Sequence, residues 1–211
     1  MTGPEDVEIQ SLVYDSRVVK PGALFVAVRG EHTDGHRHIP SALEAGAAAV
    51  VVDREGFRGD GTFIRVSDSR RALALLAAQW HGHPATQLRL VGITGTDGKT
   101  TTSFLIQALL QAAGHQAGLI GTVANYSADM EVSARYTTPE ALELHQLLAQ
   151  MVAEKNEFVV MEVSSHALAL DRVFGLPFDM GVFTNLTRDH IDFHETFEKY
   201  RAVKALLFER L

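Results

Sequence analysis

The sequence predicts an α/β fold in two parts: a small N-terminal α/β domain at residues 1–87, and a second domain at 88–211 with a mostly parallel sheet. Short runs rich in Val, Ile, Leu and Phe alternate along the chain with longer amphipathic segments. Continuous apolar strands that alternate with helices are typical of a parallel sheet covered on both faces. Between the two parts, residues 82–86 (GHPAT) combine Gly and Pro as a linker does.

The elements of the first part follow from local signals. Beta-prone runs lie between turn residues, and Ser67-Asp68-Ser69 can cap the Ala/Leu-rich helix that follows. The expected strands are 24–28, 48–52 and 62–66, and the expected helices are 40–46 and 70–81.

The second part repeats strand, loop and helix. Its expected strands are 88–94, 119–123, 158–163 and 180–184, and its helices are 100–113, 139–152 and 196–211. Thr138 is the expected cap of the second helix, because Pro139 suits a first turn. The apolar face of the first helix is expected to hold Phe104, Leu105, Ala108, Leu109 and Ala112.

Composition narrows the functional classes. The 211 residues contain no Cys, which excludes disulfide scaffolds, thiolate zinc sites and cysteine nucleophiles. A net charge of −7 argues against a nucleic-acid partner held by general electrostatic attraction. Because no apolar stretch has the length of a membrane span and the start lacks a secretion-signal profile, we expect a cytoplasmic protein without membrane insertion.

A phosphate-binding loop is predicted between the first strand and first helix of the second part. Glycines let backbone N–H groups approach a phosphate, a lysine reaches the β- and γ-oxygens, and a hydroxyl can bind Mg²⁺. The general P-loop spacing would place a glycine where the chain has Ile93, so the match rests on the G-K-T half. The alternative is a glycine-rich turn with an exposed lysine. The predicted ATP- or GTP-binding residues are Gly95, Thr96, Asp97, Gly98, Lys99, Thr100 and Thr101.

A metal-binding carboxylate is predicted at Glu162, directly after four apolar strand residues. P-loop enzymes hold their metal with such a group, and a buried glutamate needs a cation or strong donors. The alternative is a glutamate at the strand edge that faces water.

Lys204 falls in the middle of the apolar stripe of the terminal helix, among residues such as Tyr200 and Leu207. Its stem can carry the amine to the surface. Alternatively, it points into the nucleotide site, as a charge or as a CO₂-derived carbamate that binds divalent ions. His190 is the better metal candidate of the nearby histidines, and His194 is expected at the surface.

Together these motifs resemble the Mur ligases. Residues 95–101 (GTDGKTT), 161–166 (MEVSSH), 184–192 (TNLTRDHID) and 200–204 (YRAVK) occur in that family's order. The MEVSSHAL wording is similar to the MurE type, and 14–17 (YDSR) and 34–36 (DGH) resemble its UDP-binding domain. The resemblance covers nearly the whole chain.

The resemblance implies an ATP-dependent ligase that joins diaminopimelate or L-lysine to UDP-MurNAc-L-Ala-D-Glu through an acyl phosphate. Lys99 would hold the β- and γ-phosphates, while Thr100 and Glu162 would bind the first Mg²⁺. His190 would bind the second ion, with a carbamylated Lys204 between the two ions as a catalytic group. The implied substrate-binding residues are Ser16, His32, Thr33, Thr137, Thr138, Ser164 and Arg172. For Thr137 and Thr138, helix capping is an alternative role.

The chain departs from the family pattern at three points. Asp97 stands where Asn is frequent, and Leu170 replaces a polar substrate contact. The family has a third, C-terminal ligase domain, and this chain stops shortly after Lys204, so we expect a truncated central domain and an inactive fragment. A MurF-type or folylpolyglutamate-type ligase and a noncatalytic nucleotide-binding fragment are the alternatives.

Overall fold

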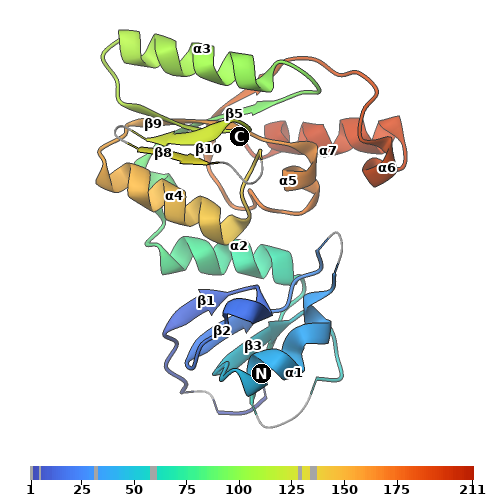
Figure 1. The fold of residues 1–211 in the computed structure, drawn as a ribbon. Helices are drawn as coiled ribbons and strands as arrows, with labels where there is room; N and C mark the ends of the chain where they lie inside the picture. The colour runs from blue at the N-terminus through green and yellow to red at the C-terminus, as the bar shows by residue number, and fades with distance from the viewer. Residues whose placement is uncertain (1, 5, 31–32, 58–60, 128–129, 134–136) are drawn as a thin grey trace. The chain divides into compact units, whose positions relative to one another are not determined.

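The computed structural model describes residues 2–4, 6–30, 33–57, 61–127, 130–133 and 137–211. They form two compact units, Met1–Trp80 and His81–Leu211 (Figure 1). The boundary after Trp80 comes earlier in the chain than the expected division after residue 87, because the 3₁₀ turn Pro84–Gln87 belongs to the second unit. Ala85 and Leu88, on either side of that boundary, are both buried in the core of the second unit.

The first unit has a four-stranded parallel sheet in the order β1-β2-β3-β4. Its strands are β1 (Ser11–Val13), β2 (Ala23–Val26), β3 (Ala49–Val52) and β4 (Thr62–Arg65), and its helices are α1 (Ile39–Glu44) and α2 (Ser69–Trp80). Phe25, Ile39, Val50 and Phe63 meet in its core. The three expected strands are present, and the short β1 is an addition that pairs with β2.

The second unit has a six-stranded sheet in the order β10-β5-β9-β6-β7-β8. The first four strands in this order are parallel, and β7 and β8 are antiparallel additions. Its strands are β5 (Arg89–Thr94), β6 (Ala117–Ile120), β7 (Ala124–Ser127), β8 (Met130–Ser133), β9 (Phe158–Glu162) and β10 (Phe178–Phe183). Its helices are α3 (Lys99–Ala112), α4 (Ala141–Ala153), α5 (Ser165–Ala169), α6 (Ile191–His194) and α7 (Phe197–Glu209).

Helices cover both faces of this sheet, as Figure 1 shows. Alternate residues of β5 point to opposite faces. Leu90 packs into the cluster that includes residues of α4, α5 and α7, whereas Val91 and Ile93 pack against α3. The carboxyl ends of the parallel strands therefore meet along one edge, where α/β sheets bind their ligands.

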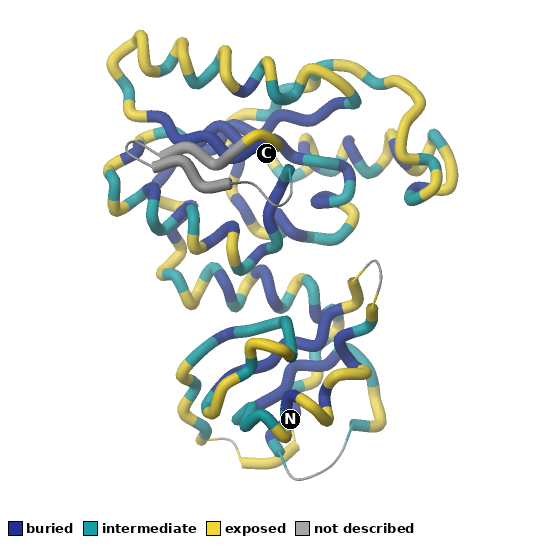
Figure 2. The backbone as a smooth tube through the Cα atoms, in the orientation of Figure 1, coloured by how far each residue is buried: buried dark blue, intermediate teal, exposed yellow. Residues whose placement is uncertain are grey.

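Helix α3 turns a different face to the sheet from the one predicted. Leu105 and Leu109 are 60% and 70% exposed, and Figure 2 shows much of the helix in yellow and teal. Ser103 is buried instead, and Ile106 and Leu110 pack on the sheet. This rotation also turns Thr100, at the helix start, toward Glu162, to which its Oγ1 donates over 3.0 Å.

The cap expected for α4 is also wrong. The helix begins at Ala141 after Glu140, and no side chain caps it. Thr138 instead donates to the carbonyl oxygen of Glu162 over 2.8 Å. None of the helices in the described part of the chain has the length and apolar character of a membrane span.

Candidate nucleotide and metal site

The predicted phosphate loop lies at the carboxyl end of β5 and leads directly into α3. Gly98 precedes the helix with φ +80°, and Gly95 has φ +152°, conformations that favour glycine. A Cβ on Gly95 would lie 1.9 Å from Thr184 Oγ1. The loop therefore needs glycine at position 95 for backbone conformation and for close approach to a neighbouring segment.

Lys99 bends back over its own loop. Its Nζ donates to the carbonyl oxygens of Gly95 and Thr96 over 2.9 and 2.7 Å. Burial lowers the pKa of Lys99, while Glu162, Asp97 and Asp189 act in the opposite direction. The ammonium group is therefore held against backbone carbonyl oxygens of its own loop.

Glu162 ends β9 next to the loop and is only 1% exposed, so the water-facing alternative is wrong. Its carboxylate accepts from Thr100 Oγ1 at 3.0 Å and from the N–H and Oγ1 of Thr122 at 2.9 and 3.0 Å. A Cβ on Gly121 would come within 2.3 Å of Glu162 Oε1. A buried carboxylate and a hydroxyl beside a phosphate loop are the hard oxygen donors that Mg²⁺ prefers.

Lys204 does not extend to the surface, and its residue is only 3% exposed. Its Nζ donates over 2.7 Å to Gly95, the same carbonyl oxygen that Lys99 contacts, and lies 4.6 Å from the centre of the Tyr200 ring. Burial, reinforced by Lys99 and opposed by Asp189, lowers the pKa of Lys204 to about 8. More of this amine is therefore neutral near pH 8, and the neutral amine is the form that combines with CO₂.

The histidines after β10 take positions that differ from the expectation. His190 is half-exposed, with its ring centre 4.9 Å from that of His166 and 6.4 Å from that of Tyr200. His194, expected at the surface, is buried. This burial is the main reason why the pKa of His194 is lowered to about 4. No group of three or more His, Asp or Glu side chains in the described residues is arranged to hold a metal ion.

The substrate-binding residues expected in the second unit lie together beside Glu162. Thr138 Oγ1 accepts from the N–H of Ser164 at 3.1 Å, and Arg172 Nη1 donates to the Thr138 carbonyl at 3.2 Å. Thr137 is linked to the carboxylate through Thr122, whose Oγ1 lies 3.1 Å from Thr137 Oγ1. Ser164 also caps α5 by accepting from the N–H of Ala167.

The remaining predicted substrate residues belong to the first unit. Ser16 starts the 3₁₀ turn Ser16–Val18 at the carboxyl end of β1. Thr33 is exposed, with Oγ1 3.1 Å from His38 Nε2. His32 lies outside the described residues.

Four residues without a predicted role contact the loop or Glu162: Thr122, Thr184, Asn185 and Tyr200. Tyr200 OH lies 3.0 Å from Thr96 Oγ1, and Thr184 Oγ1 donates to the Asp97 carbonyl over 2.6 Å. The signal that could have found Thr184 and Asn185 is topological. They follow β10, and β10 is the parallel neighbour of β5.

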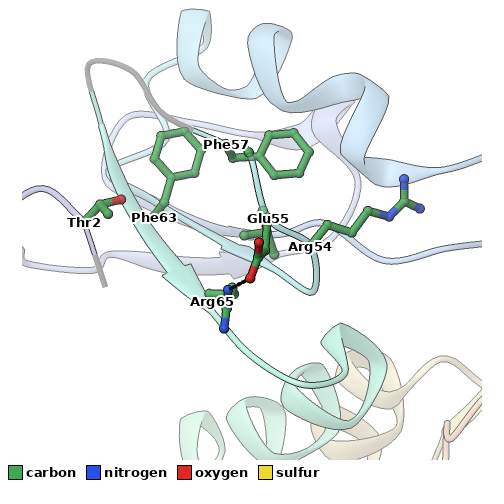
Figure 3. Close-up of a pocket in the computed structure, with 8 residues that line it drawn as sticks. Thr2, Arg54, Glu55, Phe57, Phe63 and Arg65 are labelled. Atoms are coloured by element: carbon green, nitrogen blue, oxygen red, sulfur yellow. Dashed lines mark hydrogen bonds and ion pairs between the residues drawn. The ribbon is translucent and has the colours of Figure 1, made fainter.

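The first unit contains a hollow of about 610 Å³, shown in Figure 3, lined by Phe57 and Phe63 among others. Its two arginines are already paired: Arg65 with Glu55, and Arg54 with Asp34. None of the predicted site residues lines it.

The mostly parallel sheet, the glycine-rich loop between β5 and α3 and the buried acid at the end of β9 define an α/β protein with a strand–loop–helix motif of the P-loop kind. Family profiles then give the particular assignment. The Mur ligase middle domain matches residues 93–211, and the profile described as Mur ligase family, catalytic domain, matches residues 8–81. The chain belongs to the Mur ligase family.

Individual relatives are similar over almost the whole chain. The UDP-N-acetylmuramoyl-L-alanyl-D-glutamate–2,6-diaminopimelate ligase of Clostridium tetani is 47% identical over 99% of the chain, which spans 44% of that protein. The UDP-N-acetylmuramyl-tripeptide synthetase of Roseiflexus is 49% identical over 99% of the chain and 42% of that protein. The chain thus spans less than half the length of these curated relatives.

Solved structures show the same fold. A structure of a UDP-N-acetylmuramoyl-L-alanyl-D-glutamate–2,6-diaminopimelate ligase has a TM-score of 0.81 at 29% identity, covering 96% of this chain and 41% of that chain. The MurF ligase of Thermotoga maritima, solved with ADP, has a TM-score of 0.58 at 28% identity, covering 93% and 42%.

Proposed function

We propose that this chain supplies the N-terminal and central parts of a MurE-type ligase, which uses ATP to join an amino acid to UDP-MurNAc-L-Ala-D-Glu in the cytoplasm. One observation carries the proposal: Lys99, Glu162 and Lys204 come from three segments and all reach the phosphate loop or the helix that follows it. Phosphoryl transfer needs mainly this kind of positioning and charge neutralisation.

Each charged residue then has a distinct task. Lys99 would leave the Gly95 and Thr96 carbonyls and neutralise the β- and γ-phosphates of ATP. Thr100 and Glu162 would hold one Mg²⁺, and His190 with a carbamylated Lys204 would hold a second. When bound, these ions neutralise charge on the transferred phosphoryl group.

The residues beside Glu162 would align the D-glutamate carboxylate of the substrate, which receives the phosphoryl group. Transfer of the γ-phosphoryl group to the D-glutamate carboxylate of the substrate gives an acyl phosphate and ADP. Attack by the amine of the incoming amino acid forms the amide bond and releases phosphate. Thr137, Thr138, Ser164 and Arg172 would hold the substrate near the loop. Ser16, His32 and Thr33 would bind the uridine end.

The relatives favour the MurE type over the alternatives. The Clostridium tetani relative at 47% identity is named for diaminopimelate as its amino-acid substrate, whereas the solved MurF ligase of Thermotoga maritima is 28% identical. We therefore propose diaminopimelate, rather than L-lysine, as the acceptor amino acid.

Calorimetric titration of the chain with Mg-ADP tests the nucleotide site. Lys99→Met should weaken binding by about tenfold or more, because the charge on the phosphates is lost. The control Lys20→Met changes an exposed lysine of the first unit and should leave the affinity within about twofold. Equal affinities of the wild-type protein and Lys99→Met would contradict the proposed role of the loop.

A second titration tests the substrate class. UDP-MurNAc-L-Ala-D-Glu should bind to the wild-type chain more tightly than the corresponding UDP-MurNAc-tripeptide, which a MurF-type enzyme would prefer. The opposite order would overturn the MurE assignment and leave nucleotide binding unaffected.

A further inference from the structure

The four residues that directly follow strand β10 lie against the phosphate loop. We call residues 184–187 the loop support. The N–H of Thr184 donates to the Thr94 carbonyl over 3.0 Å, which continues the parallel pairing of β10 with β5 past the strand end. This pairing places the next side chains of the loop support beside the backbone of the phosphate loop.

The side chain of Asn185 forms hydrogen bonds with both the backbone N–H and the backbone carbonyl group of Asp97 in that loop. Its Oδ1 accepts from the N–H of Asp97 at 3.0 Å, and its Nδ2 donates to the carbonyl oxygen of Asp97 over 3.2 Å. Thr184 Oγ1 donates to the same carbonyl over 2.6 Å. An amide side chain offers a donor and an acceptor at once, which a carboxylate of the same size cannot do.

Thr96 is held from the same side. Its N–H donates to the Asn185 carbonyl at 3.0 Å, and its Oγ1 accepts from the N–H of Thr187 at 3.0 Å. The same hydroxyl lies 3.2 Å from the Thr187 carbonyl and 3.0 Å from Tyr200 OH. The loop support thus contacts the backbone of Thr96 and Asp97 and the hydroxyl group of Thr96.

These contacts matter because a phosphate loop works through its backbone N–H groups, which must already point toward one centre. Gly95 and Gly98 have positive φ angles and add conformational freedom to the loop. The side chain of Lys99 contacts the loop only through carbonyl oxygens of Gly95 and Thr96, which it would leave on binding phosphate. Contacts from another segment remain when the nucleotide arrives, so they reduce the ordering cost of binding.

We propose that Asn185 and Thr184 are positioning residues that preform the phosphate loop for nucleotide. The inference rests on the proposed nucleotide binding and adds residues that act through the backbone of Thr96 and Asp97 rather than by touching phosphate. Asp97 makes the support more important in this chain, because its exposed carboxyl group lies on a loop that must accept another anion.

Three substitutions test the loop support by changing or keeping its hydrogen-bonding groups. Asn185→Asp replaces the Nδ2 donor with an oxygen that faces the Asp97 carbonyl, and we expect Mg-ADP affinity to fall by about tenfold or more. Thr184→Val removes the hydroxyl and should weaken binding by about fivefold, whereas Thr184→Ser keeps the donor and should remain within about twofold.

A matched control separates this effect from general loss of stability. Asn156→Asp makes the same exchange at a buried residue just before β9, at the opposite end of the strands from the loop. Its Nδ2 donates to the Met151 carbonyl, so the substitution should lower the unfolding midpoint without changing Mg-ADP affinity. A loss of affinity in Asn156→Asp equal to that in Asn185→Asp would overturn the proposal.

Amide hydrogen exchange without nucleotide gives an independent readout. Asn185→Asp and Thr184→Val should speed exchange at residues 96–97 in the nucleotide-free protein, while Thr184→Ser should not. Unchanged exchange in all three variants overturns the loop support even if the wild-type chain binds Mg-ADP. Faster exchange in Asn185→Asp and Thr184→Val, combined with a wild-type chain that fails to bind Mg-ADP, supports the positioning role of residues 184–187 but overturns the proposed nucleotide binding.

Discussion

Two buried charged side chains of opposite sign lie next to the phosphate loop. Burying an ion is costly unless hydrogen bonds or an opposite charge compensate it. Glu162 has its compensation in Thr100 and Thr122, and Lys204 has the Gly95 carbonyl and the Tyr200 ring. A buried charge does not improve the packing of an apolar core. The burial of Glu162 and Lys204 is therefore explained best by a proposed ligand that interacts with both groups.

Another buried ionisable side chain, His145 on α4, predicts a pH dependence of stability. The residue is 3% exposed, and burial, reinforced by His81 and His83, lowers the pKa of His145 to about 4 from 6.5. As the pH falls below 6.5 the unfolded chain takes up the proton first. The contribution of neutral His145 to the free energy of unfolding is therefore fully present above pH 6.5. As the pH falls toward 4, this contribution decreases by on the order of 2 to 3 kcal/mol.

Urea unfolding at several pH values between 7.5 and 4.5 checks this expectation. His145→Leu should reduce the decline in the free energy of unfolding over that range, and the part that remains should come from groups such as His194, whose pKa is also lowered to about 4. A decline of the same size in wild type and variant would show that His145 is not responsible.

At the scale of elements, α7 connects the core to the phosphate loop. Its residue Leu207 is fully buried beside Gly92 of β5, where an added Cβ would lie 3.0 Å from the Leu207 side chain. On the same helix, Tyr200 and Lys204 contact the loop. The position of α7 on the sheet thus decides where the amine of Lys204 lies.

The start of α7 gives a stability prediction. Thr196 Oγ1 accepts from the N–H of Lys199 at 3.1 Å and so caps the helix. Thr196→Ala should lower the free energy of unfolding by about 1 kcal/mol, because the amide loses its partner, whereas Thr196→Ser should cost only a few tenths. Urea unfolding measures both, and equal stability of Thr196→Ala and wild type would contradict the capping role.

At the scale of the whole molecule, the chain divides into two units with separate sheets and separate cores. The phosphate loop, Glu162 and Lys204 all belong to the second unit, while Ser16 and Thr33 belong to the first. Under the proposed function, different units would therefore bind ATP and the uridine group of the substrate.

Hydrogen exchange with each ligand tests this division. Mg-ADP should slow exchange at 94–101 and 184–190 and leave the first unit unchanged, while UDP should slow exchange only in the first unit, around residues 11–18 and 33–38. In Lys99→Met the effect of Mg-ADP should largely disappear and that of UDP should remain. Protection spread evenly over both units by either ligand would contradict the assignment.

Sequence patterns predicted the elements that carry strong local signals. The apolar runs at β3, β5 and β9 were confirmed, because burial on both faces of a sheet requires unbroken hydrophobic residues. Strand β1, with three residues, and the antiparallel β7 and β8 were missed. Such short strands form because a neighbouring strand pairs with them, and a local pattern does not show that partner.

The sequence alone determined the fold class and the position of the glycine-rich loop, since residue type and spacing decide these properties locally. For Glu162 and Lys204 it left burial beside that loop as one of two alternatives. Tertiary structure decided which face of α3 meets the sheet, that Thr138 serves Glu162 and Ser164 rather than a helix cap, and that Asn185 supports the loop. These contacts join residues far apart in the chain, and strand order brings them together.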